Sequence, residues 1–362
     1  MAISCSVFGK RGDEDPSRRS SPVSLTLERV AVTDPRWRQF ADARPEATVF
    51  HRLEWSALLA EAYGYDAFAV IASDSGQTIA GAPFIRIGGR RRASWSSLPF
   101  TDSCPPLGDP RGVERLVGSV KPLAADEGVS TVEMRWAADP GEGDVKTIGV
   151  NHVLSLEGGA DPTARLASTA HARNVRRARA DGVEVSMGTD AADVDVFYDL
   201  HVRTRRRQGV PVQPVRFFRL LHQRIIARGL GFVAIARRAR RPLAAAIFLG
   251  SGSTLVYKFG ASDEREWAHR PNDILFHTII AHACRQGFLS LDFGRTDLED
   301  LGLRRFKSSW GARESDLRYT VFGSHRDRLI VRVGGALLAP LIRHSSPAVC
   351  RVLGEAFYRY AA

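Results

Sequence analysis

The stretch Tyr257–Ala312 decides the predicted fold. It contains Y-K-F-G-A-S-D at Tyr257–Asp263, R-P-N-D-I-L-F-H-T-I-I-A-H-A-C-R-Q-G at Arg270–Gly287, and L-D-F-G-R-T-D from Leu291. Two short apolar runs flank a longer segment with helical spacing, so the order predicts strand, crossover helix and strand. The following R-F-K-S-S-W-G-A predicts a loop that presents one lysine, Lys307, among aromatic residues.

Part of this pattern occurs twice. Phe68–Ile85 (F-A-V-I-A-S-D-S-G-Q-T-I-A-G-A-P-F-I) and Phe232–Leu249 (F-V-A-I-A-R-R-A-R-R-P-L-A-A-A-I-F-L) align without a gap, and each predicts two apolar strands around a polar turn. A helix is expected before each hairpin, and a second helix that leads into a strand is expected after it. These flanking segments are Leu53–Tyr63, Val113–Gly128 and Thr131–Trp136 in the first copy, and Val215–Arg228, Asp273–Gly287 and Leu289–Phe293 in the second.

The repeat predicts an α/β (α+β) fold with two similar domains, each a mixed sheet flanked by helices. We expect a disordered tail at 1–24, domains at 25–157 and 158–325, and C-terminal helices at 326–362. The glycine-rich stretch Gly158–Pro162 lies near the joint. Leu329–Leu341 and Ala348–Tyr360 predict the final two helices, either a hairpin that packs on the second domain or a membrane-surface element.

These motifs, from about Arg52 to the C-terminus, resemble the Fem-type family of the GNAT acyltransferase superfamily, which includes peptidoglycan aminoacyltransferases. The resemblance is specific in the second half and looser in the first. It implies a tandem GNAT fold and an N-acyltransferase that moves an acyl group to an amine. One departure is that the second half has no long heptad-patterned insertion of the kind that some family members carry.

Three residues are the catalytic candidates. Phe306 and Lys307 match a Phe-Lys pair of the family, in which the lysine polarises the acyl carbonyl; the alternative is a solvated loop lysine. Asp292 ends a predicted core strand, where it could hold the amine or only cap the next loop. Tyr257 resembles a substrate-contacting tyrosine, although tyrosine is also a common strand residue.

Substrate contacts are predicted at further positions. Arg176 and Arg177 lie in a basic helical segment, and Arg207 belongs to T-R-R-R-Q-G, which matches a phosphate-contacting pattern of the family. In the first half, Asp102 in S-L-P-F-T-D-S-C-P-P-L resembles an acid of the acceptor cleft. Trp55 resembles an aromatic residue of the substrate wall, and core packing is the alternative for it.

The donor is predicted from the segment that enters the crossover helix. D-E-R-E-W-A-H-R-P-N-D is acidic, has no glycine and contains a proline, whereas a diphosphate cradle needs bare backbone N–H groups. This argues against acyl-CoA as the donor. The resemblance to the Fem-type family then implies aminoacyl-tRNA as the donor, and a phosphate-bearing amine is expected as the acceptor. Acyl-CoA remains the alternative donor, and a non-catalytic RNA- or membrane-binding protein is the third interpretation. No cofactor is expected.

The composition indicates which binding partners and which cellular location to expect. The net charge of +11 favours a polyanionic partner or membrane headgroups, although a surplus of arginines can also be only solvated surface. The 4 cysteines form neither a C-x-x-C pair nor a cluster with histidines, which argues against disulfides and a zinc site. Because the first 24 residues lack an apolar segment, we expect no signal peptide and a cytoplasmic protein that visits the inner membrane face.

Overall fold

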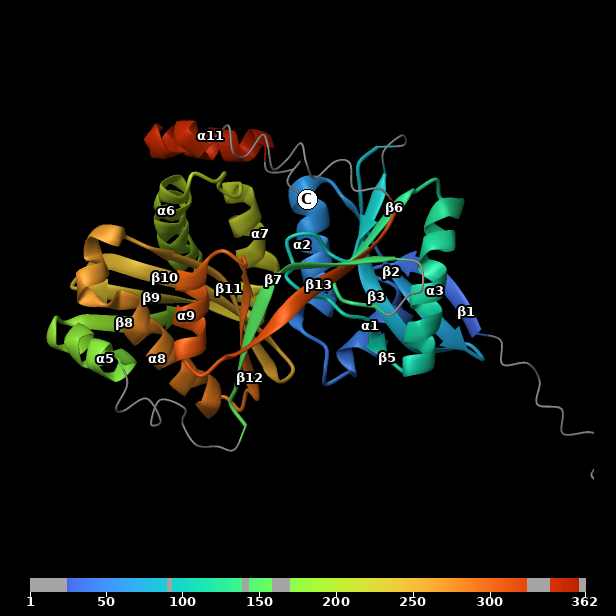
Figure 1. Ribbon diagram of the computed structural model, residues 1–362, viewed down its shortest axis with the longest axis horizontal. Coiled ribbons are helices and arrows are strands. Elements are labelled where there is room, and N and C mark those ends of the chain that lie inside the picture. Colours follow the sequence, from blue (N-terminus) through green and yellow to red (C-terminus); the bar gives the residue numbers. More distant parts are fainter. Residues whose placement is uncertain (1–24, 90–92, 139–142, 158–169, 324–338, 358–362) are drawn as a thin grey trace, which may run out of the picture.

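The protein is described from a computed structural model, which covers residues 25–89, 93–138, 143–157, 170–323 and 339–357. One sheet of 13 strands runs through both halves of the molecule in the order β1-β2-β3-β4-β6-β13-β7-β12-β11-β10-β9-β8, and β5 pairs with β3 off this path. Figure 1 shows the N-terminal half on the right and the C-terminal half on the left.

The strands of the N-terminal half are β1 Leu25–Ala31, β2 Asp66–Asp74, β3 Gln77–Ile87, β4 Ser94–Ser96, β5 Leu107–Gly108, β6 Thr131–Met134 and β7 Asp144–Ser155. Those of the C-terminal half are β8 Val183–Gly188, β9 Gly231–Arg238, β10 Arg241–Ser251, β11 Thr254–Ser262, β12 Ser290–Thr296 and β13 Arg313–Phe322. The α-helices are α1 Pro35–Asp42, α2 Leu53–Tyr63, α3 Pro110–Asp126, α5 Ala170–Ala180, α6 Ala191–Gln208, α7 Val215–Arg224, α8 Pro271–Arg285, α9 Leu301–Ser309 and α11 Pro347–Phe357.

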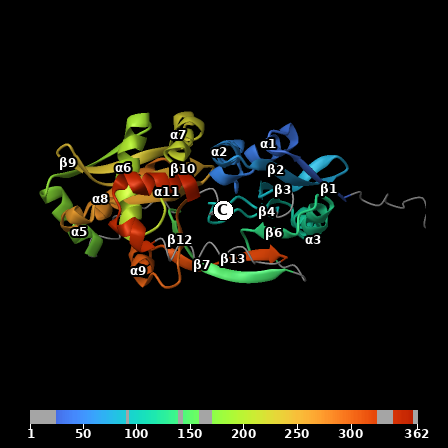
Figure 2. The same ribbon diagram turned by 90° about the horizontal axis from the view of Figure 1, so that it is seen from above.

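The two halves exchange their last strands. β7 ends the N-terminal half in sequence, yet it pairs with β12 and β13 of the C-terminal half. β13 returns across the molecule and pairs with β6 on its other side. Figures 1 and 2 show β7 and β13 running side by side across the junction. The exchange makes the sheet continuous, and it places the loops around β6, β12 and β13 at one junction.

Alternation along β10 separates two cores. Ala245, Ile247 and Leu249 belong to a core that also contains residues of α2, α6 and α7, while Ala244, Ala246 and Phe248 belong to a core under α5 and α8. Successive strand side chains point to opposite faces, so this division follows from the strand period of two. Because α2 comes from the first half and packs against α7 of the second, the first of these cores joins the halves.

The predicted fold class is confirmed, and most predicted elements are found where the periodicity placed them. α2 spans the predicted Leu53–Tyr63, both hairpins form, and β11, α8 and β12 give the predicted strand, helix and strand. One element is wrong: Lys307 lies in the last turns of helix α9 and not in a loop. Asp300 caps this helix, because its carboxylate accepts a hydrogen bond from the backbone N–H of Leu303.

The C-terminal segment packs on the second half. α11 corresponds to the second predicted helix and contacts α6, with Cys350 buried and Val352 67% exposed. The first predicted helix and the 1–24 tail lie largely or wholly outside the described residues. The domain boundaries and the membrane contact stay predictions. Among the described residues, no helix is long and apolar enough to cross a membrane.

Candidate active site

The site lies where two parallel strands separate. β11 and β12 pair only at Thr254–Ser290, Leu255–Leu291 and Val256–Asp292. Beyond this point a bulge in β11, opposite Ile247 and Phe248 of β10, shifts its register. A bulge re-aims the side chains next to it. The separation therefore brings residues of β11, β12, α9 and the loop before β5 around one opening.

Lys307 is buried at this opening, with 2% of the residue exposed. Its Nζ donates hydrogen bonds to the carbonyl oxygens of Gly294, at 2.7 Å, and Arg295, at 3.1 Å. Burial lowers the pKa of Lys307 to about 8, against the opposing effect of Asp102, Asp292 and Asp300. An ammonium has three hydrogens, and these bonds use two of them. One donor remains for a substrate oxygen.

Two carboxylates face this lysine from different halves. Asp292 accepts a hydrogen bond from the N–H of Gly294 at 2.8 Å, and burial, with the nearby Asp102, raises its pKa. Asp102 accepts a hydrogen bond from the N–H of Arg295 at 3.2 Å. Gly294 has a φ of +67°, and a Cβ placed on it would lie 2.6 Å from Asp102 Oδ2. Only glycine therefore allows the two halves to approach here.

Lys258 is a site residue that the sequence reasoning missed. Its Nζ donates to the carbonyl oxygen of Phe100 at 2.6 Å and lies 5.5 Å from the ring centroid of Trp55. Burial lowers the pKa of Lys258, opposed chiefly by Asp102. Burial alone would raise the pKa of Asp102, but Lys258, the N–H of Arg295, Lys307 and Arg135 together lower it. The only sequence signal for Lys258 was its position next to Tyr257.

Tyr257 and Phe306 form the apolar side of the opening. The Tyr257 ring packs 5.0 Å from that of Phe276, and burial raises its pKa to about 12. A Cβ on Gly260 would lie within bonding distance of the Tyr257 hydroxyl, so the glycine makes room for it. Phe306 packs against Phe276 at 5.5 Å. Both rings therefore pack on the same phenylalanine.

The structure brings together Asp102, Asp292 and Lys307, whose charges act on one another. The backbone carbonyl of Tyr257 lies near Gly294, but its ring packs in the core against Phe248 and Phe276. Trp55 is completely buried, and its indole N–H donates to Thr101 Oγ1 at 2.9 Å. In this position Trp55 supports Lys258 and the loop of Asp102 rather than reaching a substrate. Its predicted role as a substrate contact has no support in the geometry.

The three predicted arginines lie away from the opening. Arg207, on the last turn of α6, donates to the carbonyl oxygen of Ser262 at 3.3 Å and lies 4.8 Å from the Trp267 ring, beside the segment that enters α8. Arg176 and Arg177 are exposed on α5, where Arg177 pairs with Asp181 at 3.0 Å. Arg207 is thus the one arginine of the three placed at the entrance to the crossover helix.

The N-terminal turn of α8 contains a second network that the sequence did not reveal. Asp273 Oδ1 lies 2.6 Å from His171 Nδ1, and His171 Nε2 lies 2.7 Å from Ser309 Oγ. Trp310 stacks on the imidazole at 3.9 Å. Ser309 also donates to the carbonyl oxygen of Phe306. The network ties α5 to α8 and α9.

No metal centre accompanies these residues. In the described ranges, no three His, Cys, Asp or Glu side chains group together in a way that could hold a metal ion. The charged side chains at the opening are two lysines and two aspartates, beside backbone carbonyls. Such a set can polarise a carbonyl and accept a proton.

Comparisons with known proteins concern the fold. Residues 167–317 match the family described as an acetyltransferase (GNAT) domain. No curated protein sequence matches the chain. Among solved structures, FemX is 14% identical, with a TM-score of 0.64 over 84% of this chain and 99% of that one.

Two further structures share the fold. The C-terminal domain of a putative lysylphosphatidylglycerol synthetase from Agrobacterium fabrum is 14% identical, with a TM-score of 0.55 over 84% of this chain and 95% of that one. A tandem GNAT protein from the clavulanic acid biosynthesis pathway is also 14% identical, with a TM-score of 0.52 over 82% of this chain and 98% of that one. This chain therefore carries a GNAT acyltransferase domain within a Fem-like, tandem GNAT fold.

Proposed function

We propose that the protein is an N-acyltransferase that moves an aminoacyl group from aminoacyl-tRNA to an amine. The observation that carries this proposal is the group of Lys307, Asp292 and Asp102 at the separation of β11 and β12. A buried cation beside a carboxylate of raised pKa is the pair that acyl transfer to an amine requires. The GNAT acetyltransferase match of residues 167–317 supports the reaction class.

The proposed step assigns one role to each group. Asp292, as the carboxylate, accepts a proton from the acceptor ammonium, and the neutral nitrogen attacks the ester carbonyl carbon. The remaining hydrogen of Lys307 Nζ stabilises the developing oxyanion. The C–N bond forms as the ester C–O bond breaks, and the departing 3′ oxygen of the tRNA takes the proton that the attacking nitrogen loses. Asp292 then returns its own proton to solvent. Tyr257 and Phe306 keep water away from the ester, and Asp102 holds the Gly294–Arg295 turn that positions Lys307.

The choice of donor rests on the helix N-termini. In the C-terminal half, the first turn of α8 has its own carboxylate, Asp273, paired with His171. In the N-terminal half, Asp109 caps α3 by accepting from the N–H of Arg111. A carboxylate at a helix N-terminus already uses the partial positive charge that a diphosphate would need. Both positions therefore disfavour a coenzyme A diphosphate.

The glycines before α3 support the same conclusion. A Cβ on Gly108 would lie 2.1 Å from the carbonyl oxygen of Ile79, and one on Gly112 would lie 2.7 Å from the Ala80 side chain. Both glycines are therefore needed where β5 and α3 pack closely on β3, which gives them a structural role apart from phosphate binding. Arg207, beside the entrance to α8, is the proposed contact for a tRNA phosphate.

Acyl-CoA is the second candidate donor, because the matching family is described as an acetyltransferase. Calorimetric titration of the full-length protein with acetyl-CoA separates the two donors. We expect no binding up to millimolar acetyl-CoA, and transfer of a labelled amino acid from a mixture of charged tRNAs to an added amine. Micromolar binding of acetyl-CoA, with transfer of its acetyl group, would overturn the donor assignment while keeping the acyltransferase.

A further inference from the structure

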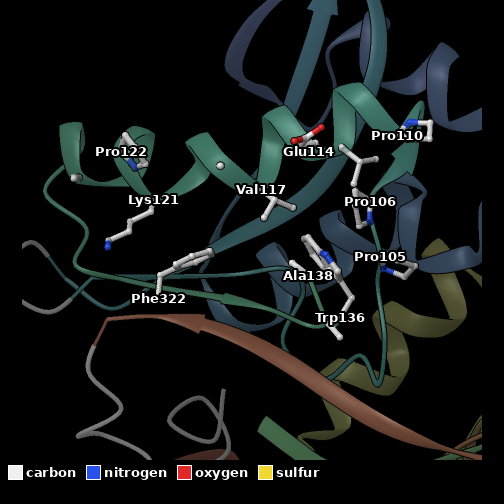
Figure 3. Close-up of a pocket in the computed structure, with 14 residues that line it drawn as sticks. Pro105, Pro106, Pro110, Glu114, Val117, Lys121, Pro122, Trp136, Ala138 and Phe322 are labelled. Atoms are coloured by element: carbon white, nitrogen blue, oxygen red, sulfur yellow. The ribbon is translucent and has the colours of Figure 1, made fainter. Parts of the chain in front are cut away.

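A large pocket lies under α3 in the N-terminal half, apart from the opening around Lys307. Its cavity volume is about 1110 Å³, and Trp136, Phe322 and Val117 give it a largely apolar lining. Figure 3 shows α3 along one wall, with Trp136 and Phe322 facing it from the other side. Pockets of this size and character hold small organic molecules.

One wall of this pocket has a backbone acceptor without its helical partner. Pro122 lies inside α3 and has no N–H, so the carbonyl of Gly118, four residues earlier, lacks the donor that a helix normally supplies. Both residues line the pocket. A Cβ on Gly118 would meet nothing within 4 Å, so the space beside this residue is open. The wall thus offers a hydrogen-bond acceptor to a ligand.

The charged side chains that line the pocket lie toward its two different ends. Glu114, Gly118 and Pro122 follow one another at intervals of four residues, which places them in one row on the helix surface. Glu114 is exposed at one end of the row, and Lys121 lies toward the other end (Figure 3). A carboxylate and a carbonyl on an apolar wall together suit an N–H donor that carries a positive charge.

The carboxylate end of the pocket is the end nearer the proposed site. Pro105 lines the pocket there, and it follows Asp102 by three residues, a span of about 10 Å at most. The loop between them is fixed, because Tyr319 donates to the carbonyl oxygen of Asp102 at 2.6 Å and His51 Nε2 lies 2.8 Å from that of Pro105. A ligand that binds here has its amino end directed toward Asp102.

We propose that the pocket under α3 binds the apolar body of the acceptor, and that the acceptor is therefore a hydrophobic primary amine. This inference rests on the proposed function for the role of the amine. The pocket itself is tested by binding, without donor and without turnover. A failure of the pocket proposal can therefore be told apart from a failure of the proposed acyl transfer.

The test is calorimetric titration of the full-length protein with tryptamine and with indole-3-propionic acid, which has the same ring and the opposite charge. We expect tryptamine to bind at least tenfold more tightly than the acid. Gly118→Trp should abolish tryptamine binding by filling the open space, whereas Gly118→Ala should retain it. Lys307→Met should also retain it. Equal binding of amine and acid, or undiminished binding by Gly118→Trp, overturns the proposal.

Pro122→Ala should have opposite effects on two quantities, the stability of the protein and its affinity for tryptamine. Alanine restores the N–H that satisfies the Gly118 carbonyl and removes a helix breaker, so the melting temperature should rise. The same change should weaken tryptamine binding about tenfold, because the carbonyl is no longer free for the ligand. Glu114→Gln should weaken tryptamine binding but not that of the acid. A Pro122→Ala protein that binds tryptamine as tightly as the wild type contradicts the role of the carbonyl.

Discussion

The ammonium nitrogen of Lys307 lies 2.7 Å from the carbonyl oxygen of Gly294, the residue that also allows Asp102 to approach from the other half of the molecule. One short turn of β12 therefore holds a cation from α9 and an anion from the N-terminal half. Asp102 accepts from the N–H of Arg295, and Lys307 donates to the carbonyl oxygens of Gly294 and Arg295, so a shift of this turn would disturb both groups. The turn connects the geometry of the site to the way in which the halves join.

Replacing Lys307 with methionine should lower the rate of aminoacyl transfer strongly while leaving the protein folded. Burial lowers its pKa from 10.5 to about 8, which corresponds to a cost of about 3 kcal/mol for keeping the charge. Methionine removes that cost but leaves two carbonyl groups without a donor, at about 1–3 kcal/mol each. The opposing effects should leave a folded protein, while aminoacyl transfer falls about 10²–10³-fold.

The measurements are transfer rate and thermal unfolding, with Lys146→Met as the matched control. Lys146 is exposed on β7 and far less constrained, so its replacement should change neither quantity. A Lys307→Met enzyme with the wild-type rate would remove the lysine from the proposed mechanism.

The pH dependence of transfer should have two limbs. Lys307 must stay protonated, so the rate should fall above its pKa of about 8. Asp292 must be ionised, and burial raises its pKa, so the rate should also fall on the acid side at a pH above that of an ordinary aspartate. A pH–rate profile of the full-length protein checks both limbs. A rate that stays constant between pH 7 and 10 would contradict the assignment of Lys307.

The free energy of unfolding should also depend on pH because of Lys307, and the direction of this dependence can be stated. Because the folded-state pKa of Lys307 is below its unfolded value, the unfolded chain binds more protons between about pH 8 and 10.5. The free energy of unfolding of the wild type should therefore rise with pH across this window, relative to Lys307→Met. Urea titrations of the two proteins at pH 7.5 and 10 measure the free energy of unfolding at each pH. An equal change between the two pH values in both proteins would contradict the prediction.

His171→Ala should be destabilising, because it leaves the buried Asp273 carboxylate without its ion-pair partner and with only the hydrogen bond from Asn174 Nδ2, at 3.2 Å, of its two side-chain contacts. Breaking a buried pair in this way costs about 3–5 kcal/mol. Adding Asp273→Asn removes the uncompensated charge, so the double variant should be more stable than His171→Ala alone. Thermal unfolding compares the variants, with the exposed His344→Ala as control. Additive effects of the two substitutions would show that the residues do not act as a pair.

Separate halves should not fold on their own. A fragment of residues 25–157 contains β7 without its partners β12 and β13, and a fragment of 158–325 contains β13 without β6 and β7. Each fragment would expose unpaired strand edges, which favour aggregation. We expect both to lack cooperative unfolding alone, and to co-purify as a folded complex when produced together. Two independently folded fragments would contradict the exchange of strands.

Local sequence patterns determined the hairpins, the crossover helix and the two strands that contain Tyr257 and Asp292. Alternation and helical spacing report which side of an element is buried, and this information is local. The absence of glycine before α8 likewise needed no structure, and it already disfavoured a diphosphate cradle at that helix.

Only the tertiary structure decided how these elements form a site. The exchange of β7 and β13 depends on pairing between residues far apart in the chain, which periodicity does not encode. Lys258 enters the site because a bulge in β11 shifts the register there. Lys307 is buried because α9 docks on the Gly294 turn, and His171 meets Asp273 because α5 packs on α8. The burial and the pKa of a side chain follow from such long-range contacts. The sequence could therefore identify Lys307 as a candidate, but it could not predict the surroundings of this lysine.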